Sequence, residues 1–304
     1  MCNRETGVVK RANDSWDGQP MDRAATDQKS DAAVDLVVTD LDGTLWHTDD
    51  HVAPDVVAAF LRLQAAGVPV LVATGRRIDS TRRPLAAVGL APPAVVLNGA
   101  LGLDLANGVR FHRAPYRQGE AAAVLAAFTE VGLQPVVHVD GGEVDGIHAL
   151  LGPAPTTHPE HAASFGDTAL VGDLATNLDR YPVLGFSVIG VDHAACVAAR
   201  DAVGDSSEPH LDRSLDYPGL ATLTVAPSGQ SKWDGVLAYC AAHGLDSTRV
   251  LALGDGSNDL ELLDNAAVAL VPKVAHREAL ARADHVIPAA AEGGWVQVID
   301  HVWP

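Results

Sequence analysis

The sequence has few cysteines, no long apolar run and little positive charge. Its three cysteines, Cys2, Cys196 and Cys240, are far apart and form no CxxC pair. This spacing argues against a disulfide framework or a zinc site, and it favours a reducing compartment. No apolar run approaches the roughly 20 residues that cross a membrane, and the first residues contain no apolar signal-peptide segment. We therefore expect a cytoplasmic protein with no membrane partner.

Positive charge is scarce. Lysine and arginine number 21 against 39 aspartates and glutamates, which gives a formal net charge of −18. This balance argues against a nucleic-acid backbone or an anionic membrane surface as the natural partner. An anionic small molecule would have to be held by a local arrangement of donors, because the overall field repels it. We expect a monomer or a homodimer.

The composition is that of a globular protein. The chain has 304 residues, of which 47% are hydrophobic and 20% are charged, and this length favours two domains. Residues 1–33 are polar and aperiodic, which predicts a disordered N-terminal tail.

From residue 34, short apolar, β-branched runs alternate with segments that have helical spacing. This rhythm predicts an α/β fold built on a Rossmann-like, doubly wound parallel sheet. The expected strands are 34–40, 68–75, 93–99, 249–256, 267–271 and 284–287, and the expected helices are 54–67, 77–90, 231–244 and 258–266.

The rhythm stops at residues 101–225, which we interpret as an inserted α+β domain. The catalytic core would then comprise residues 34–100 and 226–304. Within the insert we expect helices at 118–132 and 193–204, strands at 135–140, 183–190 and 220–226, and a loop at 152–168.

Polar residues follow the expected core strands. Asp40 and Asp42 end the first strand, Thr74 ends the second, Asn98 ends the third, and Asp255 ends a later one. In open α/β sheets, ligands bind beyond the carboxyl ends of the strands. We therefore expect these side chains to converge, with Lys232 joining them from the start of a helix.

The chemistry of this set points to phosphate and a metal ion. Asp40 and Asp42 lie on one face of a strand, so their like charges repel unless a cation balances them. Together with Asp255 they supply the hard oxygen ligands that Mg²⁺ prefers. One carboxylate could attack phosphorus while its neighbour acts as general acid and base. Thr74, Lys232 and backbone N–H groups near Gly43 could stabilise the phosphoryl charge.

Four motifs carry a family resemblance: DLDGT (40–44), ATGR (73–76), Lys232 and GDGSND (254–259). In this order they resemble the haloacid dehalogenase superfamily. The insert follows the third strand, and together with NGA (98–100) this placement resembles the Cof-like branch with a type IIB cap. The resemblance implies a Mg²⁺-dependent phosphatase of a small phosphate monoester, either a sugar phosphate or a phosphorylated cofactor, with the insert as a cap that closes over the core.

The resemblance also implies residue roles. Asp40 would be the nucleophile, and Asp42 would be the acid/base, reaching Mg²⁺ only through its backbone carbonyl. Asp255 would bind Mg²⁺, and Asp259 would support the metal site and Lys232. The sequence departs from the usual family pattern at Trp46 and His47, which follow DGTL. The complete expected site is catalytic Asp40, Asp42, Thr74 and Lys232; phosphate-binding Gly43, Thr44, Gly75, Arg76, Asn98 and Asn258; and metal-binding Asp40, Asp42, Asp255 and Asp259.

Two other kinds of protein fit part of this pattern. A phosphomutase would use the same phosphoaspartate on Asp40 but return the phosphoryl group to the sugar. A phosphoaspartate signalling module, or a sugar-phosphate-binding protein without turnover, would bind without releasing phosphate. Signalling modules of the receiver type have a different motif order and lack both DxDGT and a large insert, so we favour the phosphatase.

Overall fold

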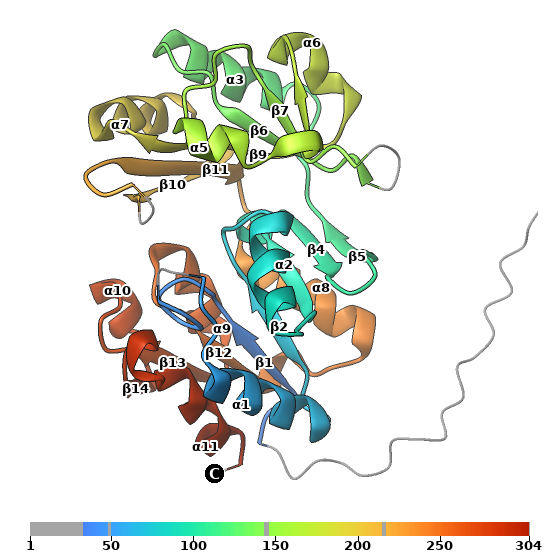
Figure 1. The fold of residues 1–304 in the computed structure, drawn as a ribbon, viewed down its shortest axis with the longest axis vertical. Helices are drawn as coiled ribbons and strands as arrows, with labels where there is room; N and C mark the ends of the chain where they lie inside the picture. Colours follow the sequence, from blue (N-terminus) through green and yellow to red (C-terminus); the bar gives the residue numbers. More distant parts are fainter. Residues whose placement is uncertain (1–32, 48–49, 143–145, 215–216, 304) are drawn as a thin grey trace, which may run out of the picture. The chain divides into compact units, whose positions relative to one another are not determined.

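The computed structural model describes residues 33–47, 50–142, 146–214 and 217–303 (Figure 1). Apart from Ala33, the expected disordered tail at 1–33 lies outside these residues. Among the described residues, no helix has both the length and the apolar character needed to cross a lipid bilayer.

Eight strands form the core sheet, in the order β14-β13-β12-β1-β2-β3-β4-β5. The strands from β14 to β3 pair in parallel, whereas β4 and β5 are added antiparallel at one edge. Their bounds are β1 Leu36–Thr39, β2 Val70–Ala73, β3 Pro93–Val96, β4 Leu101–Asp104, β5 Arg110–Arg113, β12 Val250–Leu253, β13 Val268–Pro272 and β14 His285–Ile287.

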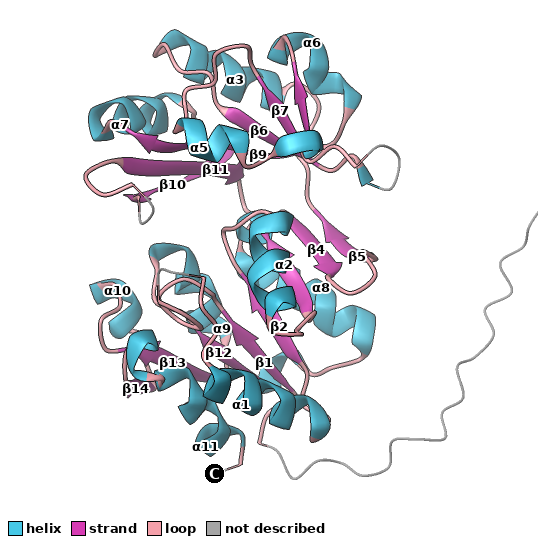
Figure 2. Cartoon of the chain, in the orientation of Figure 1, coloured by secondary structure: helices cyan, strands magenta, loops and turns pink. Residues whose placement is uncertain are grey.

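Helices cover both faces of the core sheet (Figure 2). Side chains alternate along β1, so Val37 packs in one apolar cluster and Val38 in another. The first cluster contains Phe60 of α1, and the second contains Val236 of α8. Both faces of the parallel strands are therefore buried, and the predicted doubly wound α/β class is confirmed. The helices are α1 Pro54–Ala65, α2 Ile78–Ala87, α8 Lys232–His243, α9 Leu260–Asn265, α10 Arg277–Leu280 and α11 Val298–Val302.

A second, six-stranded sheet has the order β10-β11-β9-β6-β7-β8. We call it the cap sheet. Phe128 and Cys196, from two helices, pack with Phe186 in its apolar cluster. This is the α+β insert expected from the sequence. Its elements are α3 Glu120–Glu130, β6 Val136–Val139, β7 Ala149–Leu151, α5 Pro159–Ala163, β8 Ala169–Val171, α6 Leu174–Asn177, β9 Val183–Val191, α7 His193–Ala202, β10 Ser207–Arg213 and β11 Ala221–Pro227.

Strand pairing corrects two details of the sequence interpretation. The insert was expected to begin at residue 101, but β4 pairs with β3 and β5 pairs with β4 in the core sheet. The short turn Leu97–Gly99 reverses the chain there, which a strand-end motif does not reveal. The stretch 152–168, expected to be a loop, contains α5. We propose a division with the cap at 114–227 and the core on either side of it.

One buried ion-pair cluster joins the two sheets. Asp140, which follows β6, has a side chain closed to solvent. Its carboxylate accepts a hydrogen bond from Arg110 Nη2 at 3.0 Å and also pairs with Arg113. Both arginines belong to β5, so the β4–β5 hairpin is fastened to the first strand of the cap sheet.

Candidate functional site

Four polar residues lie just beyond the carboxyl ends of adjacent parallel strands. Asp255 follows β12, Asp40 follows β1, Thr74 follows β2, and Asn98 lies in the turn after β3. Because these strands are neighbours in the core sheet, residues far apart in the sequence meet at one edge. The expected convergence is therefore present in the geometry.

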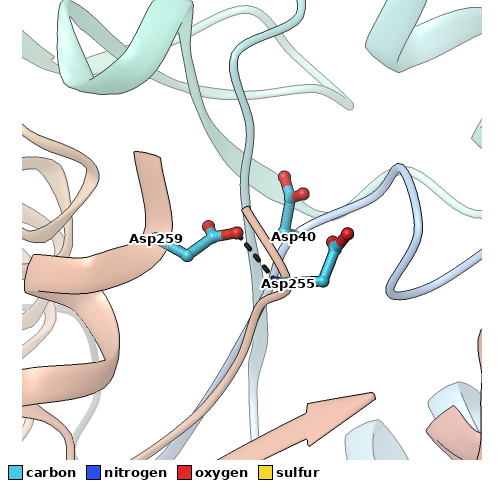
Figure 3. A group of neighbouring side chains, drawn as sticks. All are labelled: Asp40, Asp255 and Asp259. Atoms are coloured by element: carbon cyan, nitrogen blue, oxygen red, sulfur yellow. Dashed lines mark hydrogen bonds between the residues drawn. The ribbon is translucent and has the colours of Figure 1, made fainter. Parts of the chain in front are cut away.

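Three carboxylates form a tight group at this edge (Figure 3). One oxygen from each of Asp40, Asp255 and Asp259 lies within 4.8 Å of the other two. Asp40 and Asp259 are buried, and Asp255 is half-buried. Carboxylate oxygens brought this close repel one another, so the group is suited to a hard divalent cation.

Lys232 lies against the same group. Its Nζ donates to Asp40 Oδ1 at 2.9 Å and to Asp259 Oδ1 at 2.7 Å, and only 1% of its side chain is exposed. The start of α8 fixes this placement through a capping box. The Ser231 backbone N–H donates to the Asp234 side chain, and the Ser231 side chain accepts from the Asp234 backbone N–H. The ammonium therefore enters the site from the first turn of a firmly capped helix.

The net charge of the group favours the binding of a cation. Three ionised carboxylates face one ammonium, so two negative charges remain unbalanced. One Mg²⁺ would neutralise them. Burial raises the pKa of Asp40 well above its usual value; Lys232 opposes this rise, and Asp259 and Asp255 add to it. Burial and Asp259 likewise raise the pKa of Asp255 to about 6. Burial disfavours the charge of Lys232, but Asp259 and Asp40 outweigh it and raise its pKa.

The hydrogen bonds distinguish the three carboxylates. Asp259 Oδ1 accepts from Lys232, and its Oδ2 accepts from the backbone N–H groups of Asp255 and Gly256 at 3.0 and 2.8 Å. Both of its oxygens are therefore engaged with the protein. Asp255 Oδ1 accepts from the Thr44 hydroxyl at 2.7 Å. Asp40 and Asp255 are thus better placed than Asp259 to hold a metal ion, and Asp259 contacts Lys232 and the loop after β12.

The Asp42 side chain is not part of this three-carboxylate group. Its carboxylate accepts from Arg76 Nε and Nη2, both at 2.5 Å, and from Trp46 Nε1 at 3.0 Å. Arg76 also pairs with Asp50 at 2.6 Å. The sequence assigned Asp42 to the metal site and Arg76 to the phosphate. In the structure the two side chains bind each other, which leaves Asp42 only its backbone carbonyl for a metal contact.

The remaining expected residues pack closely around Asn98. Its Oδ1 accepts from Asn258 Nδ2 at 2.9 Å, and its Nδ2 donates to the Thr224 hydroxyl of β11 at 3.2 Å. A Cβ atom at Gly75 would lie 2.8 Å from Asn98 Oδ1, so any larger residue there would displace the Asn98 amide. Thr74 is buried, and its hydroxyl accepts from the Arg76 N–H at 3.2 Å. The Asn98 amide therefore bonds two protein partners, and its second N–H has no hydrogen-bond partner among the described residues.

A cavity of about 390 Å³ opens onto these residues. Asp40, Asp42 and Thr74 line it from the core. Cap residues that the sequence interpretation missed also line it, including His138, Ser187, Thr222, Thr224 and Tyr217. Polar residues at alternate positions of an otherwise apolar strand, as at Thr222 and Thr224, are the signal that could have identified them.

Comparison with known families decides the identity. The model of the haloacid dehalogenase-like hydrolases matches residues 37–168 and 196–299. The chain belongs to this family. The superfamily predicted from the four motifs is thereby confirmed, and with it the enzyme class of hydrolase.

Relatives of this hydrolase are similar over most of their length. The pyridoxal phosphate phosphatase of Escherichia coli is 23% identical over 83% of this chain and 92% of its own. The 5-amino-6-(5-phospho-D-ribitylamino)uracil phosphatase of Bacillus subtilis is 28% identical over 76% and 83%. A solved subclass IIB sugar phosphatase, 19% identical, covers 88% of this chain and 98% of its own with a TM-score of 0.67. The capped fold expected from the insert's position is thus also confirmed.

Proposed function

We propose that this hydrolase is a Mg²⁺-dependent phosphatase that removes phosphate from a small phosphorylated metabolite through a phosphoaspartate on Asp40. The observation that carries the proposal is the placement of Asp40. It lines the cavity, and it lies both within the three-carboxylate group and 2.9 Å from Lys232. The phosphatase relatives named above support the reaction class.

Asp40 and Asp255 would hold the Mg²⁺, with Asp259 behind them and the Asp42 carbonyl beside them. Bound there, Mg²⁺ would offset the repulsion between carboxylates and neutralise charge on the phosphoryl oxygens. Lys232 keeps Asp40 oriented, because its ammonium also binds the buried Asp259. The nucleophile is therefore held in place before the substrate arrives.

In the first half-reaction, an Asp40 oxygen attacks phosphorus. A bond forms between that oxygen and phosphorus, and the bond between phosphorus and the ester oxygen breaks. Asp42 in its protonated form gives its proton to the departing oxygen, which leaves as an alcohol. The Thr74 hydroxyl can donate to a phosphoryl oxygen during this transfer.

In the second half-reaction, water attacks the phosphorus of the phosphoaspartate. Asp42, now ionised, takes a proton from that water, and the bond between Asp40 and phosphorus breaks. Inorganic phosphate is released, Asp40 returns as a carboxylate, and Asp42 is again protonated. Cap residues such as His138 and Tyr217 also line the cavity, and we expect them to select the alcohol.

The test is release of inorganic phosphate from a panel of phosphorylated sugars, phosphorylated cofactors and p-nitrophenyl phosphate. It is run with Mg²⁺ and with chelator, on the wild type and on Asp40→Asn. Asp264→Asn is the matched control, because Asp264 forms an exposed pair with Arg282. We expect release that requires Mg²⁺, disappears in Asp40→Asn and persists in the control.

Three outcomes would contradict the proposal. Release that continues in Asp40→Asn would exclude Asp40 as the nucleophile. Conversion of a sugar phosphate to an isomer, without free phosphate, would favour the phosphomutase. Mg²⁺ binding without turnover of any compound would favour a binding or signalling module.

A further inference from the structure

Trp46 marks the point where this sequence departs from the family pattern, and its backbone is held in a tight turn. The N–H groups of Leu45 and Trp46 both donate to the Leu41 carbonyl, at 2.9 and 3.1 Å. The Gly43 N–H in turn donates to the Trp46 carbonyl at 2.9 Å. This turn brings the indole back onto Asp42, two residues beyond the proposed nucleophile.

The indole completes a set of three donors around the Asp42 carboxylate. Oδ1 accepts from both Trp46 Nε1 and Arg76 Nη2, at 3.0 and 2.5 Å. Oδ2 accepts only from Arg76 Nε, at 2.5 Å, among the hydrogen bonds of the described residues. The guanidinium also lies over the indole ring, 5.1 Å from its centre. Each of the three side chains, Asp42, Arg76 and Trp46, therefore contacts the other two.

A carboxylate oxygen has two lone-pair positions for hydrogen bonds. At Oδ1 both positions are filled, by an arginine and by an indole. At Oδ2 one position remains, and Asp42 lines the cavity. The two oxygens are thus chemically distinct, and Oδ2 is the one that can carry a proton without losing a hydrogen bond from the protein.

We propose that Trp46 is a positioning residue that fixes the Asp42 carboxyl so that Oδ2 is its reacting oxygen. This inference rests on the function proposed above. Oδ2 gives its proton to the ester oxygen as that oxygen leaves phosphorus, and later takes a proton from the attacking water. Trp46 is only 1% exposed, so it acts through Asp42 and not by touching substrate.

The test compares two leaving groups in Trp46→Phe. Phenylalanine keeps an aromatic ring beside Arg76 but has no N–H to donate. An alkyl leaving group needs the proton from Asp42, whereas p-nitrophenolate is stable as an anion and needs it far less. We expect kcat for the best alkyl phosphate of the panel to fall by about tenfold, the loss expected for one hydrogen bond to a charged group. For p-nitrophenyl phosphate we expect a much smaller fall, and KM should change little for either compound.

Trp295→Phe is the matched control. Trp295 is also fully buried, but its Nε1 donates to the Thr39 hydroxyl at 2.9 Å and not to Asp42. General loosening of the core should lower both rates together and leave their ratio unchanged. A second variant replaces Trp46 with β-(3-benzothienyl)alanine, which has the shape of tryptophan and no N–H, so it keeps the test usable if Trp46→Phe does not fold.

A selective loss of the alkyl reaction in the Trp46 variants, with an unchanged ratio in Trp295→Phe, supports the inference. An unchanged ratio in the Trp46 variants of an active enzyme overturns this inference and leaves the phosphatase proposal intact. A wild type that hydrolyses neither compound overturns the phosphatase proposal and this inference with it.

Discussion

Lys232 Nζ lies 2.7 Å from Asp259 Oδ1, and neither side chain is more than 1% exposed. The same ammonium binds Asp40, and the same carboxylate also holds the loop after β12 through two backbone N–H groups. This pair therefore connects the start of α8, the end of β1 and the end of β12. The pair links these three elements, and its lysine places a positive charge next to the proposed nucleophile.

Removing the ammonium should cost stability as well as activity. We expect Lys232→Met to lower the free energy of unfolding by about 3 kcal/mol, because it leaves two buried carboxylates without their partner. Urea denaturation measures this change. Lys273→Met is the control, since Lys273 forms an exposed pair with Glu292 and should change little. Equal effects in the two variants would contradict a special role for the buried pair.

The metal-free site should respond to pH. Burial and neighbouring carboxylates raise the pKa of Asp255 to about 6 and that of Asp40 well above its usual value. Both groups hold protons more tightly in the folded state, so they favour folding below the unfolded pKa near 4. Asp255 loses that contribution as the pH rises through about 6, and Asp40 loses it as the pH rises through its own raised pKa. As Asp255 ionises, the repulsion between the carboxylates increases.

Mg²⁺ should therefore stabilise the protein more at pH 7.5 than at pH 5. We expect saturating Mg²⁺ to raise the Tm by about 5 °C at pH 7.5 and by much less at pH 5. Thermal denaturation with Mg²⁺ and with chelator at each pH gives the difference directly, and histidine titrations largely cancel in it. A Tm increment that is the same at both values would refute the assignment.

Two glycines with the same backbone angle allow a paired test of the metal site. Gly43 and Gly67 both have a φ of +77°, but a Cβ atom would lie 2.3 Å from Asp255 Oδ2 at Gly43 and would contact nothing within 4 Å at Gly67. Alanine at either position should cost about 1 kcal/mol of stability through backbone strain. Only Gly43→Ala should also displace Asp255, and we expect its apparent affinity for Mg²⁺ to fall by at least tenfold.

Activity titrated with Mg²⁺ separates these two effects. A normal Mg²⁺ dependence in Gly43→Ala would mean that Asp255 is not a ligand. A weakened dependence in Gly67→Ala would mean that strain alone explains the result.

Two substitutions of Asn98 separate the effect of its backbone angle from the effect of its side-chain hydrogen bonds. Leu97 and Asn98 have φ values of 52° and 54°, which only glycine adopts freely. Asn98→Ala loses the bonds to Asn258 and Thr224, and we expect the free energy of unfolding to fall by about 2 kcal/mol. Asn98→Gly loses the same bonds but relieves the strain, so urea denaturation should show a smaller loss. Glycine as the more damaging replacement would contradict the role of the backbone angle.

The sequence predicted the features that are local. The strands β1, β2 and β12 are short apolar runs that end in polar motifs, so these strands and the placement of Asp40, Thr74 and Asp255 could be predicted from patterns of a few residues. The capping residues around Lys232 are local in the same sense. The insert could be recognised where the βα rhythm stops, and the family resemblance identified it as a cap.

The contacts that escaped prediction are long-range. The Asn98 amide, which was expected at the phosphate and does line the cavity, also bonds Thr224, 126 residues away, and no local pattern encodes that bond. Arg76, also expected at the phosphate, lines the cavity too, and its pairing with Asp42 at the end of the neighbouring strand was not predicted. The hairpin of β4 and β5 was assigned to the insert because the turn after β3 resembles the end of a strand. In each case the competing partner is visible only once the chain is folded.

The Asp140 cluster has a practical consequence for anyone building chimaeras in this family. A cap moved without the β4–β5 hairpin would bring a buried carboxylate and leave behind the two guanidinium groups that neutralise it. A hairpin kept without its cap would leave Arg110 and Arg113 without the carboxylate that they pair with. The exchangeable unit is therefore longer than the cap sheet, and a viable crossover point lies before β4, within the core itself.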